Sequence, residues 1–143
     1  MKRFLYLAAV AVLGLASYAG LVSPAHPPLD RADIQQQFDA YNDVYFAGKL
    51  PPTVVNFVTF TDVREGYDKY GQALCNAANT ACTIELASWM RGHYSVAKEV
   101  ELHEMCHIAV WRLVQQRGED DHGPTWMKEM HRLMDAGAFD DVL

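Results

Sequence analysis

The sequence predicts one α+β domain in which a small three-stranded sheet packs with three main helices. A chain of 143 residues can bury one sizeable core, and no linker-like stretch divides it into two domains. Half of the residues are hydrophobic and 21% are charged, which is the balance of a globular protein. Helical periodicity gives way once to strand-like segments and then returns. This order of helix, strands, helix and helix indicates an α+β fold.

The first predicted helix spans residues 29–47. Asp30 can cap its start, and Gly48 can close its end. Its apolar and aromatic side chains recur at helical spacing, at Ile34, Phe38, Tyr41 and Tyr45. A pair of prolines then breaks the helix, and residues 53–60 are rich in the β-branched and aromatic side chains of a strand.

Two further strands are predicted after an irregular loop at residues 61–71. They span residues 71–75 and 82–87 and are joined by a turn-like segment. Cys75 and Cys82 could pair across this hairpin if the chain is exported. In a reducing compartment they would instead be small buried hydrophobic residues, and Cys106 is interpreted as a packing residue in either case.

The longest predicted helix starts with Ser95 as its cap and runs to about Arg117, where Gly118 can end it. Two apolar stripes place it inside the domain. The first stripe is Val96, Val100, Val110 and Val114, with His103 and His107 on the same side. The second stripe is Leu102, Met105, Ala109 and Leu113, which leaves Lys98, Glu101, Arg112 and Gln115 for solvent. A last helix follows, with Pro124 near its first position and Gly137 past its end.

The N-terminal segment differs in composition from the rest of the chain. Lys2 and Arg3 precede nineteen uncharged residues, 4–22, and the small residues Ser23 and Ala25 follow at cleavage-like spacing. This pattern predicts that residues 1–25 are a secretory signal peptide or a membrane anchor, because the apolar run is just long enough to span a bilayer. We therefore expect an exported or membrane-anchored protein, with a cytoplasmic location as the alternative.

The charge of the chain argues against nucleic acid as a direct partner. The formal net charge is −6, and no cluster of Lys and Arg follows the first three residues. Nucleic-acid binding depends on such a basic patch, so none is expected from this chain alone.

Residues 103–107 carry the strongest chemical signal. His103 and His107 lie one helical turn apart, so both imidazoles can bind one ion. Glu104 would lie beside that ion, where its carboxylate can take a proton from metal-bound water. Zinc suits imidazole ligands and lowers the pKa of bound water to about 7. The alternative is a pair of hydrogen-bonded core histidines, which would bury Glu104 without a charge partner at a cost of several kcal/mol.

A catalytic zinc usually has three protein ligands, and His122 is the candidate for the third. It follows the long helix after a short loop and precedes Gly123 and Pro124 at the start of the last helix. The positive end of that helix disfavours an imidazolium and keeps the ring available to a metal. The neighbouring Asp120 and Asp121 could orient one of the ligand rings.

Three segments together resemble the SprT-like zinc metallopeptidase domain, the protease core found in Spartan and germ-cell nuclear antigen proteins. They are FDAYNDVYFAGKLP (38–51), LHEMCHIAVW (102–111) and HGPTWMKEM (122–130). The resemblance covers about residues 29–137. Many unrelated zincins share the metal motif alone, whereas the ordered set of three segments is more specific.

The resemblance implies a zincin-like metallopeptidase domain whose substrate is a polypeptide bound extended along a sheet edge. Such an edge supplies main-chain hydrogen bonds and so tolerates varied side chains. Tyr67 and Tyr70, in the loop before that edge, could help to stabilise the oxyanion. The implied site consists of Glu104 as general base and the zinc ligands His103, His107 and His122.

The sequence thus predicts a zinc-dependent endopeptidase, and two alternatives stay open. One is a non-catalytic zinc-binding module whose open metal position is blocked. The other is a DNA-associated protease that acts on DNA-protein crosslinks with a partner chain. Several relatives have that second role, but the acidic balance and the apolar N-terminal run of this sequence differ from it.

Overall fold

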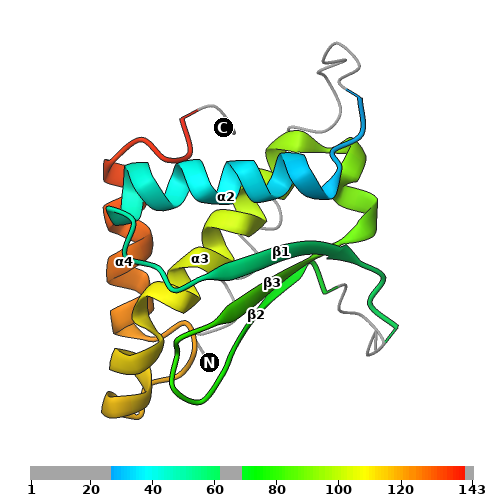
Figure 1. Cartoon of the computed structure of the whole chain (residues 1–143). Coiled ribbons are helices and arrows are strands. Elements are labelled where there is room, and N and C mark those ends of the chain that lie inside the picture. Colours follow the sequence, from blue (N-terminus) through cyan, green and yellow to red (C-terminus); the bar gives the residue numbers. More distant parts are fainter. Residues whose placement is uncertain (1–26, 62–68, 141–143) are drawn as a thin grey trace, which may run out of the picture.

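The computed structural model describes residues 27–61 and 69–140 and confirms the predicted α+β fold class within them (Figure 1). The signal peptide or anchor predicted at residues 1–25 lies outside the described residues. In the part of the chain that the structure describes, no helix is long and apolar enough to cross a bilayer. The elements are α2 (Arg31–Phe46), β1 (Thr53–Val58), β2 (Gly71–Cys75), β3 (Cys82–Ala87), the 3₁₀ helix η2 (Ser88–Gly92), α3 (Tyr94–Arg117) and α4 (Pro124–Asp135).

The three strands form one sheet in the order β1-β3-β2, with β1 parallel and β2 antiparallel to β3. The backbone N–H of Ala87 donates to the Tyr70 carbonyl, and that of Asn76 donates to the Ala81 carbonyl. In an antiparallel pair of strands, the backbone N–H and C=O groups of alternate residues point toward the partner strand. The even-numbered residues of β2 therefore make the backbone hydrogen bonds to β3. The odd-numbered residues of β2 therefore direct their backbone groups to the outer edge of the sheet.

Helix α2 begins and ends where its sequence predicts. Asp30 and Asp33 form a capping box, in which each carboxylate accepts a hydrogen bond from the other residue's backbone N–H. Ala47 and Gly48 both adopt positive φ angles and end the helix. The Gln35 side chain accepts from the backbone N–H of Val55 and donates to a β1 carbonyl. This amide therefore occupies the outer edge of β1, on the opposite side of the sheet from β2.

Three details of the α3 prediction are wrong. Ala109 and Leu113 were expected in a buried apolar stripe, but both side chains are exposed on the C-terminal half of the helix. His93, not Ser95, is the N-cap residue, because η2 leads directly into α3 and the His93 N–H donates to the Met90 carbonyl. Lys98 and Glu101 were expected in solvent, but they are only 3% and 0% exposed. The reason is that the N-terminal half of α3 is enclosed by the sheet, α2 and η2.

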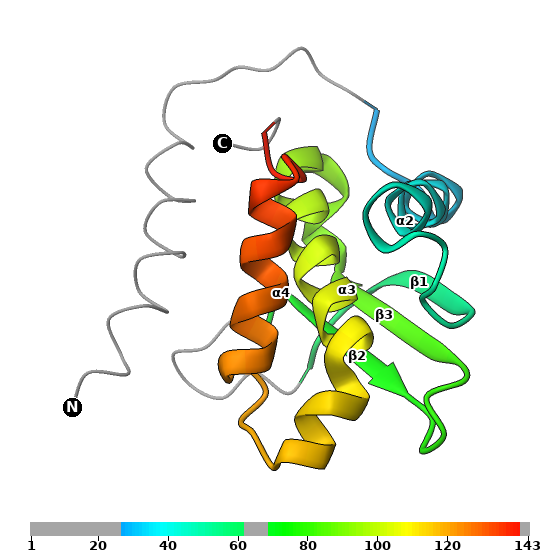
Figure 2. The same cartoon turned by 90° about the vertical axis from the view of Figure 1, so that its left-hand side faces the viewer.

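One core joins the sheet to the helices. The sheet buries one face, which carries Val55 and Ile84, whereas Val54 and Leu74 on the other face are exposed. Helices α3 and α4 lie side by side (Figure 2). Burying each large apolar side chain contributes about 1.5–3 kcal/mol, so this core holds α3 firmly against the sheet. The largest fully buried apolar side chains are Ile34, Ile84, Leu86, Met90, Leu102, Met105, Ile108 and Leu133.

The hairpin between β2 and β3 is closed by a disulfide bond between Cys75 and Cys82. Of the two states considered from the sequence, the structure has the paired one, and Cys106 is free and buried as expected. The two half-cystines are register partners on adjacent strands, so the bond fixes β2 to β3 at one end of the outer strand.

Candidate metal centre

Helix α3 and the loop before α4 bring three imidazole rings together. The Nε2 atoms of His103 and His107 are 3.2 Å apart, those of His107 and His122 are 3.2 Å apart, and those of His122 and His103 are 3.1 Å apart. A neutral ring nitrogen either donates or accepts, so three such atoms cannot all satisfy one another. Tetrahedral zinc with Zn–N bonds of about 2.0–2.1 Å would place its nitrogen ligands about 3.3 Å apart. The triangle therefore has the size that one bound ion requires.

The surroundings keep these rings neutral, which is the form that binds metals. Burial, together with the charges of the other two rings, lowers the pKa of His103 to about 3. Burial and the charge of His122 lower the pKa of His107 to about 4. The pKa of His122 is also lowered by burial, against the opposing effect of Asp121. An imidazole must be unprotonated to bind a metal ion, so the lowered pKa values leave all three rings in the form that can bind a cation near neutral pH.

Hydrogen bonds between residues before and after the loop that carries His122 hold this loop in place, and they were not predicted from the sequence. The Glu119 carboxylate accepts hydrogen bonds from the backbone N–H and the hydroxyl of Thr125, at 2.7 and 2.9 Å. Arg117 also donates to the Thr125 hydroxyl and pairs with Glu119. A Cβ on Gly123 would lie 2.8 Å from the Asp120 carbonyl oxygen, so this close passage requires glycine.

Trp126 is the second contributor that the sequence analysis missed. Its ring centroid lies 4.6 Å from that of His122, 4.8 Å from that of His103 and 5.5 Å from that of His107. The side chain is only 7% exposed, so it forms a wall of the cluster from the α4 side. Its spacing of four residues from His122 in the sequence was the available signal. However, an aromatic residue on a helix is usually interpreted as ordinary packing.

Glu104 lies between α3 and the outer strand of the sheet and is only 5% exposed. Burial raises the pKa of its carboxyl to about 7, while a hydrogen bond from the Ala73 backbone and the charge of Lys69 act in the opposite direction. Ala73 is one of the β2 residues whose backbone faces the outer edge. A Cβ on Gly71 would lie 3.1 Å from Oε1 of Glu104 and 2.7 Å from Val100, so glycine allows the strand to approach this carboxylate.

The remaining residues that the sequence analysis singled out have simpler surroundings. Tyr70 is exposed and makes an edge contact with Trp89, and Tyr67 lies outside the described residues. The charge of Asp121 partly opposes the lowering of the pKa values of His107 and His122 by burial, which is consistent with a position near the cluster. The roles suggested for these residues in orienting rings or stabilising an oxyanion stay predictions.

Three neutral imidazoles on an α+β domain, with a buried carboxylate from the same helical turn, define a candidate metal-binding domain. The three histidines could hold one metal ion. The sequence model of the SprT-like family matches residues 34–141, and the chain belongs to this family. The resemblance found in the sequence is thereby confirmed, and the family is associated with metallopeptidase-like function. No curated protein matches the chain.

Proposed function

We propose that this protein is a zinc-dependent endopeptidase of the zincin-like type. In this proposal His103, His107 and His122 hold the zinc, and Glu104 is the general base. One observation carries the proposal: the buried Glu104 carboxylate lies between the turn that bears the histidines and the outer edge of β2. A protease needs a base located between its metal and its peptide, and this position meets that need.

The ligand set favours zinc among the common metals. Three neutral imidazoles are the protein ligands of several catalytic zinc sites, in which the fourth position stays open for water or substrate. Calcium and magnesium prefer oxygen ligands, and none of the three proposed ligands supplies an oxygen. When bound, zinc would lower the pKa of a coordinated water and polarise the carbonyl of the peptide.

Glu104 would take a proton from the attacking water and pass it to the leaving amine. A carboxyl whose pKa lies near 7 can perform both transfers close to neutral pH. The Ala73 backbone N–H fixes the carboxylate through a hydrogen bond, so the base is oriented before a substrate arrives.

The proposed substrate is a polypeptide that binds as an extra strand along β2. The outward carbonyl groups of residues 71 and 73 and the outward N–H of residue 75 would pair with its backbone. Because the Gln35 amide occupies the outer edge of β1, the β2 side is the edge to which a strand can be added. This edge also lies against Glu104, so an added strand would pass the proposed base.

We further propose that the protein acts outside the cytoplasm, either exported or tethered to a membrane. The Cys75–Cys82 disulfide supports this location, because such bonds persist mainly in oxidising compartments. The acidic net charge of −6 supports a polypeptide rather than a nucleic acid as the partner.

Zinc content and the cleavage of casein and a peptide library test the function together. Wild-type protein is expected to bind one zinc and to cleave, while Glu104→Gln should keep the zinc and lose activity by about 10²-fold or more. His122→Ala should lose both, and His131→Ala is the matched control, because His131 is exposed on α4 and outside the cluster. Unchanged cleavage by Glu104→Gln would reject the mechanism. Tightly held zinc in a protein that cleaves nothing in the library would favour the non-catalytic binding module.

A further inference from the structure

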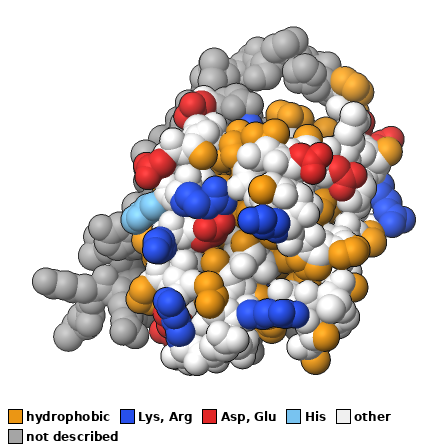
Figure 3. All heavy atoms as spheres, turned by 60° about the vertical axis from the view of Figure 1, so that its left-hand side comes forward, with side chains coloured by type: hydrophobic (Ala, Val, Ile, Leu, Met, Phe, Trp, Pro, Cys, Tyr) orange, Lys and Arg blue, Asp and Glu red, His pale blue; other side chains and the backbone are white. Residues whose placement is uncertain are grey.

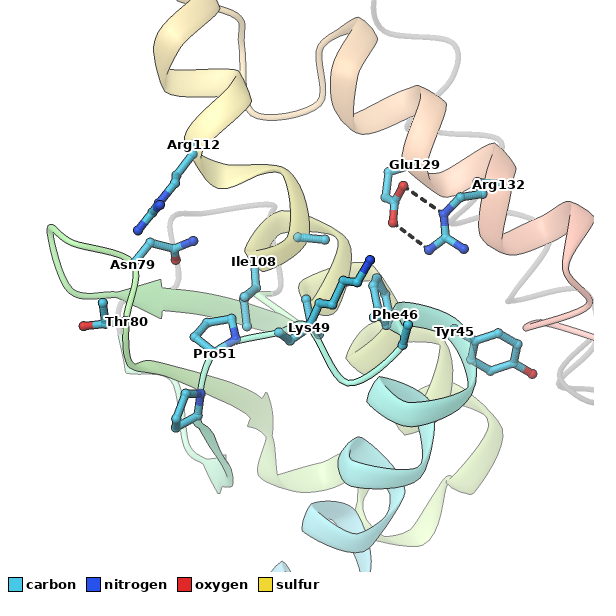
Figure 4. Close-up of a pocket in the computed structure, with 14 residues that line it drawn as sticks. Tyr45, Phe46, Lys49, Pro51, Asn79, Thr80, Ile108, Arg112, Glu129 and Arg132 are labelled. Atoms are coloured by element: carbon cyan, nitrogen blue, oxygen red, sulfur yellow. Dashed lines mark hydrogen bonds and ion pairs between the residues drawn. The ribbon is translucent and has the colours of Figure 1, made fainter.

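A second candidate site lies on another side of α3 from the histidines. It is an open hollow of about 750 Å³ between the α2–β1 connection, the β2–β3 turn, α3 and α4 (Figure 4). Ile108 and Arg112, one helical turn apart, form its α3 wall. None of the proposed zinc ligands lines this hollow, and neither does Glu104.

The hollow concentrates positive charge in an acidic protein. Lys49 reaches it from the α2–β1 connection, Arg112 from α3 and Arg132 from α4, and Glu129 is the only carboxylate among its lining residues. Lys and Arg side chains also gather beside hydrophobic ones on the α4 side of the molecule (Figure 3). Because the whole chain has a net charge of −6, this local excess of cations is not a general property of its surface.

Two of the three cations keep binding capacity. Arg112 uses one nitrogen to donate to the Ala78 carbonyl at 2.6 Å, which leaves its other N–H groups for a ligand. Within the described residues the Lys49 ammonium makes no hydrogen bond or ion pair. Arg132 is already paired: its Nε and Nη2 donate to the Glu129 carboxylate at 3.0 and 2.7 Å. Arg112 and Lys49 are therefore the groups on which an anion would depend.

The arrangement of the lining favours an extended ligand with more than one anionic group. Arg112 lies beside the Asn79–Thr80 turn, Lys49 lies in the middle of the hollow, and Arg132 lies on the α4 side (Figure 4). A single small anion would contact one of these cations, whereas a chain with spaced carboxylates can contact several. Between the cations the walls are apolar, and they are formed by Phe46, Leu50, Pro51, Pro52 and Ile108.

We propose that this hollow is a docking site for an acidic segment of a polypeptide, in which carboxylate side chains alternate with apolar ones. The carboxylates would bind Arg112 and Lys49, and the apolar side chains would lie against Ile108 and Pro51. Such a site would hold a protein away from any bond that is cleaved at the histidine cluster. Binding here does not require hydrolysis, so it can fail or succeed independently of the proposed function.

The test is fluorescence anisotropy with the full chain carrying Glu104→Gln, which prevents any cleavage of the probe. The probe is a labelled peptide in which Glu alternates with Val, and the comparison peptide has Gln in place of Glu. Binding of the Glu peptide should weaken at high salt and exceed that of the Gln peptide by about tenfold or more. Equal binding of the two peptides would overturn the proposal.

A pair of charge-reversed variants locates the binding. Lys49→Glu with Arg112→Glu should weaken binding of the Glu peptide by about tenfold or more. The control, Arg31→Glu with Lys128→Glu, makes the same change in net charge at two exposed positions outside the hollow and should change binding by less than about twofold. Equal losses in the two double variants would overturn the proposal, since they would show a general charge effect.

A charge-neutralised double variant and two phosphate-containing probes test the assignment further. Lys49→Gln with Arg112→Gln removes charge without adding repulsion, and it should also weaken binding if its circular dichroism matches that of the parent. Full binding by this folded variant would contradict the assignment. Phosphatidylserine-containing vesicles and inorganic phosphate are the other probes. If either binds through Lys49 and Arg112 while the Glu peptide does not, the hollow recognises a phosphate group and the proposal is wrong.

Discussion

Replacing Glu104 by Gln should stabilise the metal-free protein at alkaline pH and have little effect in acid. Burial raises the pKa of this carboxyl from 4.5 to about 7. The protonated side chain therefore contributes its full stability below pH 4.5, and that contribution is lost as the pH rises through about 7. Each pKa unit corresponds to about 1.4 kcal/mol, so ionised Glu104 costs about 3 kcal/mol in the folded state. Glutamine carries no charge and avoids this cost.

Urea unfolding in the presence of a chelator, followed by circular dichroism from pH 4 to pH 9, measures the effect. The difference in free energy of unfolding between Glu104→Gln and wild type should grow from near zero in acid to about 3 kcal/mol above the carboxyl's pKa. The histidines are present in both proteins, so their own titration largely cancels. Asp43→Asn, at an exposed position on α2, is the control and should show no such growth.

Two results would refute this reasoning. A difference that stays constant with pH would mean that the Glu104 carboxyl has the same pKa in the folded and the unfolded protein, so that burial does not shift it. A difference of opposite sign would mean that the carboxylate is stabilised by its surroundings rather than destabilised by burial. Adding zinc should reduce the difference, because a nearby cation favours the ionised carboxylate.

The remaining predictions concern the ligand loop, the wall of the cluster and the hairpin. His122→Ala should weaken zinc binding by more than the roughly 10- to 100-fold that loss of an outer-shell partner costs, as measured by competition with a coloured chelator. Trp126→Ala should lower the free energy of unfolding by about 3–5 kcal/mol, and Trp126→Phe should lower it less, since a ring still contacts the histidines. Replacing both Cys75 and Cys82 by Ser should cost about 2 kcal/mol in urea unfolding, because the closed loop is short.

The helices and strands could be predicted from local sequence features, because each has a recognisable capping residue, breaking residue or hydrophobic period. Asp30 and Gly48 bound α2, and the strand segments at residues 71–75 and 82–87 match β2 and β3 in full. The error at Lys98 and Glu101 arose because these charged residues were left for solvent once two apolar stripes had been assigned to the buried side of the helix. Their burial depends on how α2 and η2 enclose α3, and the period of one helix does not contain that information.

The three histidines of the candidate site were singled out from the sequence, but the residues that hold them in place were not. His103 and His107 share one helical turn, so their proximity follows from helix geometry alone. The return of His122 to the same point depends on the Glu119–Thr125 contacts, which join residues across a loop without a regular pattern. The position of Glu104 against Ala73 depends on the register and edge of the sheet, which the sequence analysis could not assign.

The Gln35 amide has a consequence for the behaviour of this protein at high concentration. Fibrous growth by strand addition needs two free edges on every molecule, one to accept a neighbour and one to offer to the next. Here the Gln35 side chain already pairs with the Thr53 carbonyl and the Val55 N–H of β1, so copies that associate through β2 meet an obstacle to further addition at the second edge. Edge-to-edge association should then stop at a closed pair instead of extending into a filament.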